Sequence, residues 1–286
     1  MKKQIITCFL CIAASFFSSY AQENLTYQKP PKPILDLVDV PLAPGTYINS
    51  KGDLMLFLYR DQYKTIAELS EKELRLGGLR INPATNISSR ARYFTDIKIK
   101  PVKDNEPTNV TGLPENPRIA NLSWSPDEKK LAFTQTTNTG VELWVIDIKS
   151  AKAKKLTDAS LNANMGNTIN WFKDSEAILV KMLPKDRKEL IDEAMAVPTG
   201  PTVSVSDGKE AQNRTYQDLL KDPNDEYNFE QLARSTLFKV DLNGNKSQWM
   251  EANMYDDISF SPDGEYIMIS HIKKPFSYLV PYYRFP

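Results

Sequence analysis

Short apolar runs separated by tight turns recur along this chain. The clearest unit covers residues 120–157 and contains the runs "ANLSW", "KLAFT", "VELWVIDI" and "AKKLT", with Pro126 and Asp127 in the turn between the first two. Proline presets φ in such a turn, and the aspartate side chain can hydrogen-bond the local backbone. The pattern therefore predicts four short antiparallel strands that follow one another as a meander.

The same unit occurs more than once. Its first hairpin, "WSPDEKKLAF", begins at Trp124, and related hairpins are "WFKDSEAILV" from Trp171 and "SFSPDGEYIMIS" from Ser259. A leading run, "TYINSKGDLMLFLY", begins at Thr46. Four strands in a repeat of about 40–45 residues are typical of a β-propeller blade. We therefore predict an all-β fold, a partial β-propeller of about three to four four-stranded antiparallel blades within residues 46–286.

One insertion interrupts the period. Trp124 and Trp171 lie 47 residues apart, whereas Trp171 and Phe260 lie 89 residues apart. Within the two units, the aspartate that ends the third strand follows the tryptophan by 23 residues in the first case and by 70 in the second, an excess of 47. Without this excess the longer spacing becomes 42, so we place a partly helical insertion at about 184–234. A solvated loop is the ordinary interpretation, and a lid or docking loop is the functional one.

Several of the predicted strands are apolar on both faces. "YIMIS" shows no alternation with polar residues, and "LWVIDI" carries apolar side chains on both sides. Strands that are packed from both sides have this pattern, as blades between neighbouring blades do. An ordinary antiparallel sandwich is the alternative.

Helical patterns are few. The insertion has one near its start, from Pro184, and others at "YQDLLKD" and "NFEQLAR". Upstream, Ser70 and Glu73 have the spacing of a capping box, which predicts a helical turn that Gly77 and Gly78 would end. The following "LRI" leads into an Asn-Pro turn.

The beginning of the chain has the pattern of an export signal. Two lysines precede an apolar run at residues 5–17, and small residues that include Ser19 and Ala21 follow. This order predicts a secretory signal peptide, residues 1–21, that is cleaved between Ala21 and Gln22. We therefore expect an exported protein, periplasmic or secreted, in which residues 22–45 form an N-terminal extension.

Two other interpretations of this segment are weaker. The apolar run is shorter than the roughly 20 residues that a membrane span needs, and Cys11 follows Phe9 and Leu10 rather than small residues, which disfavours a lipoprotein. Cys8 and Cys11 are the only cysteines in the chain, so signal removal would leave no disulfide and no thiolate metal site. No later run is long enough to predict a stable membrane span.

Charge and motifs narrow the function further. The chain has 36 Lys plus Arg and 36 Asp plus Glu, so no excess charge points to nucleic acid or to an anionic membrane surface as a partner. Residues 67–99 contain no paired carboxylates, no metal-ligand cluster and no glycine loop for phosphate. We predict no cofactor site and no metal site.

Four stretches of the chain form a recognisable set. In order, they are "LGGLRINPATNISSRARYF" from Leu76, "VPTGP" from Val197, "RTYQDLLKD" from Arg214 and "SFSPDGEYIMISHIKKPFSYLVPYYRFP" from Ser259. Together they resemble the glutamyl endopeptidase branch of the prolyl oligopeptidase family of serine peptidases. Members of that family pair a β-propeller with an α/β-hydrolase domain that carries a nucleophilic serine, an aspartate and a histidine. The resemblance implies that this chain is the N-terminal propeller portion, without the catalytic α/β-hydrolase domain.

The resemblance carries no catalytic residue onto this chain. No G-x-S-x-G motif occurs, and the single histidine, His271, falls on a predicted strand, where a structural role is expected. The leading hypothesis is the substrate-gating portion of an exported serine peptidase that hydrolyses peptides, with cleavage after Glu as the preference that the family suggests. Its partner would be a peptide substrate that reaches the missing hydrolase domain. The alternative is a stand-alone exported β-propeller that binds a protein or a glycan.

Overall fold

The computed structural model describes residues 28–104, 106–192, 208 and 216–285. The chain divides into two compact units, Met1–Pro41 and Leu42–Pro286. The predicted signal peptide with its cleavage site at Ala21 and Gln22, and the "VPTGP" stretch, lie outside the described residues.

The described part of the first unit contains one helix, α2 (Lys32–Val38). Pro33 lies in the first turn of the helix, where proline is tolerated because the N–H groups of that turn have no partner within the helix. Lys32 forms an ion pair of 2.6 Å with Asp36, one turn later on the same helix face. None of the helical residues is buried.

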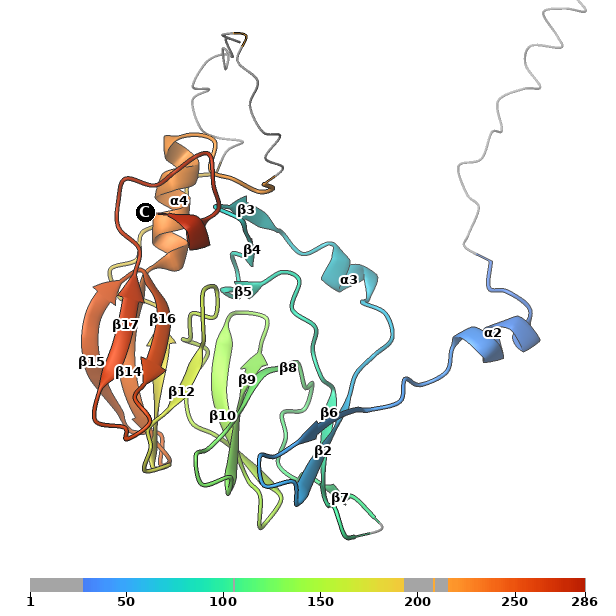
Figure 1. Cartoon of the computed structure of the whole chain (residues 1–286). Helices are drawn as coiled ribbons and strands as arrows, with labels where there is room; N and C mark the ends of the chain where they lie inside the picture. The colour runs from blue at the N-terminus through green and yellow to red at the C-terminus, as the bar shows by residue number, and fades with distance from the viewer. Residues whose placement is uncertain (1–27, 105, 193–207, 209–215, 286) are drawn as a thin grey trace, which may run out of the picture. The chain divides into compact units, whose positions relative to one another are not determined.

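The unit Leu42–Pro286 is built from successive antiparallel sheets (Figure 1). The first sheet contains β1 (Gly45–Ile48), β2 (Leu54–Tyr59), β6 (Asp96–Pro101) and β7 (Thr108–Asn109) in that order. The second contains β8 (Ile119–Trp124), β9 (Lys130–Thr136), β10 (Val141–Asp147) and β11 (Lys152–Lys155). The third contains β12 (Ile169–Trp171), β13 (Ala177–Met182), β14 (Ser235–Asp241) and β15 (Lys246–Asn253).

Within the described residues, a fourth sheet pairs β16 (Tyr255–Phe260) with β17 (Ile267–His271). In the three complete sheets, each strand pairs with the strand before it in the repeat, which is the meander that the sequence predicted. The prediction of an all-β, propeller-like fold with four-stranded antiparallel blades is therefore confirmed.

The four sheets share one turn between their first two strands. The residue that ends this turn has a positive φ in each case, 71° at Gly52, 60° at Glu128, 61° at Ser175 and 78° at Gly264. Each of the four donates its backbone N–H to the carbonyl oxygen three residues earlier, at 2.8–3.1 Å. The repeat seen in the sequence is therefore also a repeat of backbone geometry.

Apolar side chains fill the space between neighbouring sheets. All six residues of β13 are buried, as are six of the seven residues of β9. Leu143 of the second sheet and Trp171 of the third belong to one buried cluster, and Phe133 belongs to the cluster between the first and second sheets. Each such side chain contributes about 1.5–3 kcal/mol to folding, so these contacts hold the sheets face to face.

The prediction of burial on both faces is correct for "LWVIDI" and wrong for "YIMIS". Leu143 and Ile146 are both fully buried on β10. By contrast, Tyr266 and Met268, at and within β17, are each 71% exposed. The reason is local, because no described strand lies beyond β17 in its sheet.

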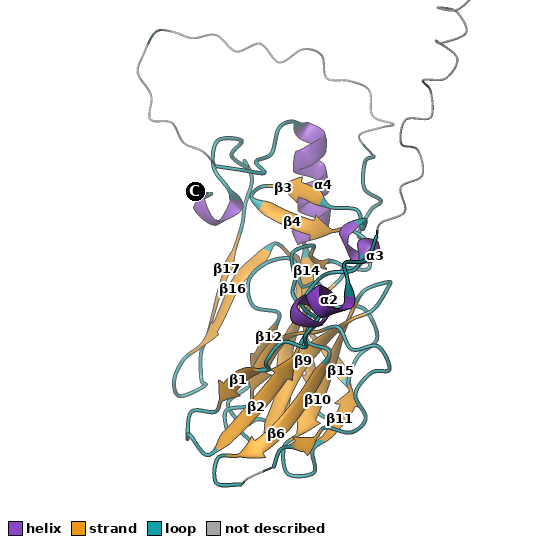
Figure 2. Ribbon diagram, turned by 90° about the vertical axis from the view of Figure 1, so that its right-hand side faces the viewer, coloured by secondary structure: helices purple, strands orange, loops and turns teal. Residues whose placement is uncertain are grey.

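Two long excursions leave the sheets between the second and third strands. The first, residues 60–95, separates β2 from β6, and the second, residues 183–234, separates β13 from β14. The second sheet joins the equivalent strands by the short turn 137–140. Figures 1 and 2 show both excursions at the same end of the sheets, as expected for equivalent connections in successive repeats.

The first excursion contains helix α3 (Ile66–Leu69) and a three-stranded sheet of β3 (Leu74–Leu76), β4 (Leu79–Asn82) and β5 (Ile87–Ser88). The sequence did not predict this small sheet, although the Asn-Pro turn after "LRI" does begin at Asn82, the last residue of β4. The second excursion contains helix α4 (Pro223–Ala233).

The excursions meet at the β3–β4 turn, Gly77 and Gly78. The Gly78 N–H donates to the Asp218 carbonyl at 2.8 Å, and Arg80 forms an ion pair of 2.6 Å with the Asp218 side chain. On the other side of the turn, the Tyr282 N–H donates to the Gly77 carbonyl at 2.7 Å. Tyr282 begins a short 3-10 turn, η1 (Tyr282–Arg284). Three of the stretches that carry the family resemblance therefore contact one another here.

The capping box lies five residues earlier than predicted. Thr65, not Ser70, caps α3, because its side chain accepts from the Glu68 N–H at 3.2 Å while Glu68 accepts from the Thr65 N–H at 2.8 Å. Ser70 ends that helix, and Glu73 bonds Ser89 and Arg75 instead. Both pairs have the capping-box spacing, but the residues after Ser70 pair as strand β3.

Two other helical predictions are wrong, while "NFEQLAR" is confirmed within α4. The described residues 184–192 and 216–222 are not helical. Side chains of α4 bind the backbone N–H groups that a helix would have used: Gln231 accepts from Lys188 and Asn228 from Ile191. None of the described helices is long and apolar enough to cross a membrane.

Candidate functional site

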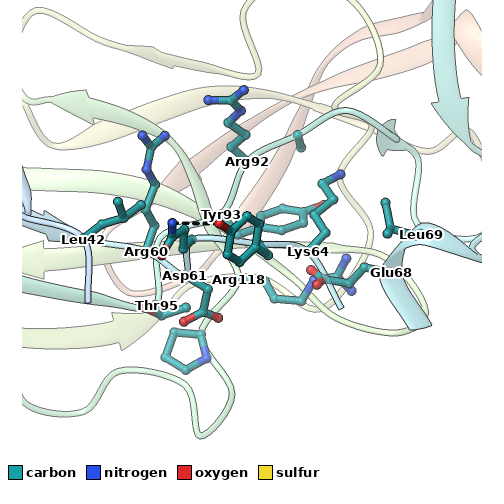
Figure 3. A pocket seen from close by; sticks show the side chains of 14 residues that line it. Leu42, Arg60, Asp61, Lys64, Glu68, Leu69, Arg92, Tyr93, Thr95 and Arg118 are labelled. Carbon is teal, nitrogen blue, oxygen red and sulfur yellow. Dashed lines mark hydrogen bonds between the residues drawn. The ribbon is translucent and has the colours of Figure 1, made fainter. Parts of the chain in front are cut away.

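A pocket of about 560 Å³ opens where the ends of β2, β6 and β8 come together (Figure 3). Its lining comes mainly from residues 60–64 after β2, 91–93 before β6 and 117–118 before β8. Register brings these ends together, because Tyr59 pairs with Asp96. Phe94 and Ile119 also exchange two backbone hydrogen bonds, of 2.9 and 3.0 Å. We call this site the Arg60–Arg92 pocket.

Cationic side chains outnumber carboxylates in the Arg60–Arg92 pocket. The charged side chains of its lining are Arg60, Lys64, Arg92, Arg118, Asp61 and Glu68. With four cations against two anions, the pocket has a local positive excess in a chain whose formal net charge is zero. A concave site with one dominant sign of charge attracts ligands of the opposite sign.

Arg118 forms the floor of the pocket with Tyr93. Its guanidinium carbon lies 4.5 Å from the centre of the Tyr93 ring, which is a cation–π contact, and Nη2 lies 3.4 Å from Glu71 Oε1. Burial raises the pKa of the Tyr93 hydroxyl, so the ring stays neutral. Arg118 is thus already engaged within the protein.

Glu68 is engaged as well. Its carboxylate accepts a hydrogen bond from the Thr65 backbone N–H and a second one, of 3.0 Å, from the Thr65 hydroxyl. The backbone N–H of Thr65 lowers the pKa of Glu68, with smaller contributions from Arg118 and Lys64. Lys64 in turn donates to the Ser89 carbonyl at 2.9 Å. These contacts order the wall of the pocket on the α3 side.

The sequence singled out none of these pocket residues. A usable signal was present in "SSRARYF", where two arginines, Arg90 and Arg92, come shortly before Tyr93 inside one of the family-like stretches. Arg60 and Arg118 lie in unrelated stretches, and only the strand register brings them to the same place.

His271 lies elsewhere in the fold. It ends β17 opposite Tyr255 and lines a separate hollow of about 410 Å³ together with Glu230 and Lys274. The prediction that the chain carries no catalytic residue stays a prediction. Among the described residues, no group of three or more His, Cys, Asp or Glu side chains could hold a metal ion.

The fold defines the class of protein, a propeller-like chain of four-stranded antiparallel sheets with a cationic pocket at one end. Sequence similarity then specifies the relatives. The chain is 34% identical over 274 residues to "Probable glutamyl endopeptidase, chloroplastic" of Oryza sativa subsp. japonica, an alignment that covers 91% of this chain and 29% of that protein. The protein of the same name from Arabidopsis thaliana is 32% identical over 273 residues, with 91% and 28% covered.

The chain thus spans less than a third of the length of these relatives. Its propeller-like fold accompanies sequence similarity to proteins named glutamyl endopeptidase, the branch that the four sequence stretches predicted. No family model matches the chain. Among solved structures, the acylaminoacyl peptidase of Pyrococcus horikoshii is similar with a TM-score of 0.42 and 16% identity, covering 86% of this chain and 30% of that one.

Proposed function

We propose that this chain is the substrate-gating portion of an exported serine peptidase that hydrolyses peptides after glutamate. In this role the propeller-like sheets limit access to short or unstructured peptides, and the face that carries the two excursions positions them. The chemistry itself, attack by a serine that a histidine activates, is assigned to residues outside this chain.

The similarity to proteins named glutamyl endopeptidase over 91% of the chain carries this proposal. The arrangement of the excursions supports it. Both emerge at one end of the sheets, and three family-like stretches meet there around Gly77 and Asp218. The family-like "SSRARYF" also supplies Arg92 and Tyr93 to the Arg60–Arg92 pocket.

Peptide cleavage by the protein that contains this chain tests the proposal. The protein is purified from its producing cells with an antibody to this chain and offered two internally quenched peptides that differ only by Glu or Gln. We expect cleavage of the Glu peptide on the carboxyl side of Glu, and much slower cleavage of the Gln peptide. Failure to cleave either peptide would refute the proposal and favour a stand-alone module that binds a protein or a glycan.

A further inference from the structure

Two of the four cations of the Arg60–Arg92 pocket are not engaged by any other described residue. Arg118 contacts Glu71 and the Tyr93 ring, and Lys64 donates to the Ser89 carbonyl. In the described part of the chain, Arg60 and Arg92 form no ion pair and donate no side-chain hydrogen bond. Both residues are exposed at the rim.

The free guanidinium groups share one side of the pocket. Figure 3 shows the side chains of Arg60 and Arg92 extending in the same direction from the Tyr93 ring, although they come from opposite ends of the first excursion. A guanidinium presents five N–H donors in a rigid planar fork that matches a carboxylate. The Tyr93 ring, which also lines the pocket, offers an apolar surface for the carbon chain that bears such a group.

The anions of the pocket do not neutralise this pair. Glu68 is held by Thr65, and its charge faces Lys64 and Arg118. Asp61 is the remaining carboxylate of the lining, next to Arg60 in sequence. It forms no ion pair with that guanidinium, but its negative charge in the same lining opposes the binding of an anion, which makes its removal an informative change.

We propose that the Arg60–Arg92 pocket binds a carboxylate group of a peptide through Arg60 and Arg92. That the ligand is a peptide rests on the proposed function, whereas the carboxylate follows from the pocket. A volume of about 560 Å³ accommodates one or two residues of an extended peptide. The carboxylate belongs either to an acidic side chain or to a peptide C-terminus, and both present the same two oxygens to the guanidinium groups.

Fluorescence anisotropy with three labelled peptides separates these sources. The first peptide carries one internal Glu and an amidated C-terminus, the second has Gln in place of Glu, and the third is the Gln peptide with a free C-terminus. We expect at least one of the two carboxylate peptides to bind the 286-residue chain about tenfold more tightly than the neutral one at low salt. The peptide that does so identifies the source, and equal binding of all three would overturn the proposal.

Variants of three arginines test the site itself. Arg60→Gln and Arg92→Gln should each weaken binding of the carboxylate peptide about tenfold, because each removes charge-assisted hydrogen bonds. Arg90→Gln is the matched control, because it removes the same charge two residues away but lies at a different hollow, beside Arg80 and Tyr216. Asp61→Asn should tighten binding.

An Arg90→Gln variant that weakens binding as much as Arg92→Gln would show nonspecific charge attraction and overturn the assignment. The thermal unfolding midpoint of each variant serves as the folding control, since neither pocket arginine pairs with another residue in the described ranges. The two proposals fail independently. If the protein that contains this chain cleaves no peptide, the peptidase function is refuted and the carboxylate site still stands. If that protein cleaves Glu peptides and neither Arg60→Gln nor Arg92→Gln changes this, the carboxylate site is refuted and the peptidase function still stands.

Discussion

The carboxylate of Glu128 accepts a hydrogen bond of 2.8 Å from the side-chain amide of Asn49, which lies in the equivalent turn of the preceding sheet. The other carboxylate oxygen accepts from the Ser50 N–H, also at 2.8 Å. Glu128 has a φ of 60°, which is costly for a residue with a side chain. Its bonds to the neighbouring turn explain how a glutamate is accommodated where two other repeats have glycine.

We expect Glu128→Ala to lower the free energy of unfolding by about 3 kcal/mol, because two hydrogen bonds to a buried carboxylate are lost while the strained φ remains. Glu128→Gln keeps the shape and one acceptor, so its loss should be about 1 kcal/mol. Urea unfolding followed by tryptophan fluorescence measures both. Equal losses for the two variants would show that the bonds to Asn49 and Ser50 do not join the sheets.

A second contact between repeats involves Gly166, in the loop between β11 and β12. A Cβ atom there would lie 1.8 Å from the Asp256 carbonyl oxygen on β16, a backbone atom that cannot move away alone. Gly166→Ala should therefore lower the free energy of unfolding by more than about 3 kcal/mol. Gly52→Ala is the control, because its φ is also positive but no atom lies within 4 Å of the added Cβ. It should cost about 1–2 kcal/mol, and a similar loss at both positions would contradict the close approach of β16.

Lys181 makes stability depend on pH. Its side chain is buried on β13, where its ammonium donates to the Met165 carbonyl. Burial lowers the pKa of Lys181 from 10.5 to about 8, although Asp256 and Asp257 act in the opposite direction. Because the unfolded chain holds this proton more tightly than the folded one, the contribution of Lys181 to the free energy of unfolding rises between about pH 8 and pH 10.5.

The test compares urea unfolding of the unaltered chain and of Lys181→Met at half-unit steps from pH 7 to pH 10. Because other groups titrate equally in both proteins, the difference between them isolates Lys181. We expect the unaltered chain to gain stability relative to Lys181→Met as the pH rises above 8. A difference that stays constant with pH would show that the ammonium keeps its usual pKa.

The repeated part of the fold was predictable because its signals are local. Each turn is encoded by residues next to one another, such as Ser261 to Gly264. The distance from each tryptophan to the aspartate that ends the third strand located the excess between β13 and β14. The exposure of "YIMIS" was not predictable from such local signals, because the exposure of Met268 depends on which strands lie beyond β17.

The excursions and the pocket depend on contacts that are distant in sequence. Residues 184–192 have a helical pattern, but Gln231 and Asn228 bind their N–H groups from α4. Similarly, Arg60 and Arg92 are 32 residues apart, and only the pairing of β2 with β6 places them at one pocket. A pattern in one stretch of sequence contains no information on such pairings.

Export is tested at the N-terminus of the protein from its producing cells. If residues 1–21 act as a signal peptide, N-terminal sequencing of the periplasmic or secreted protein should begin at Gln22. Changing Ala21 to a bulky residue, Ala21→Phe, should block this cleavage, whereas Ala13→Phe within the apolar run should not. Recovery of a cytoplasmic protein that begins at Met1 would refute export.

We propose that this chain serves a serine peptidase whose nucleophile lies in other residues, and labelling with a fluorophosphonate probe tests this proposal. We expect the probe to capture this chain from its producing cells, as part of a labelled protein or complex, whereas the purified 286-residue chain remains unlabelled. Stoichiometric labelling of the purified chain, abolished by His271→Ala, would refute the proposal.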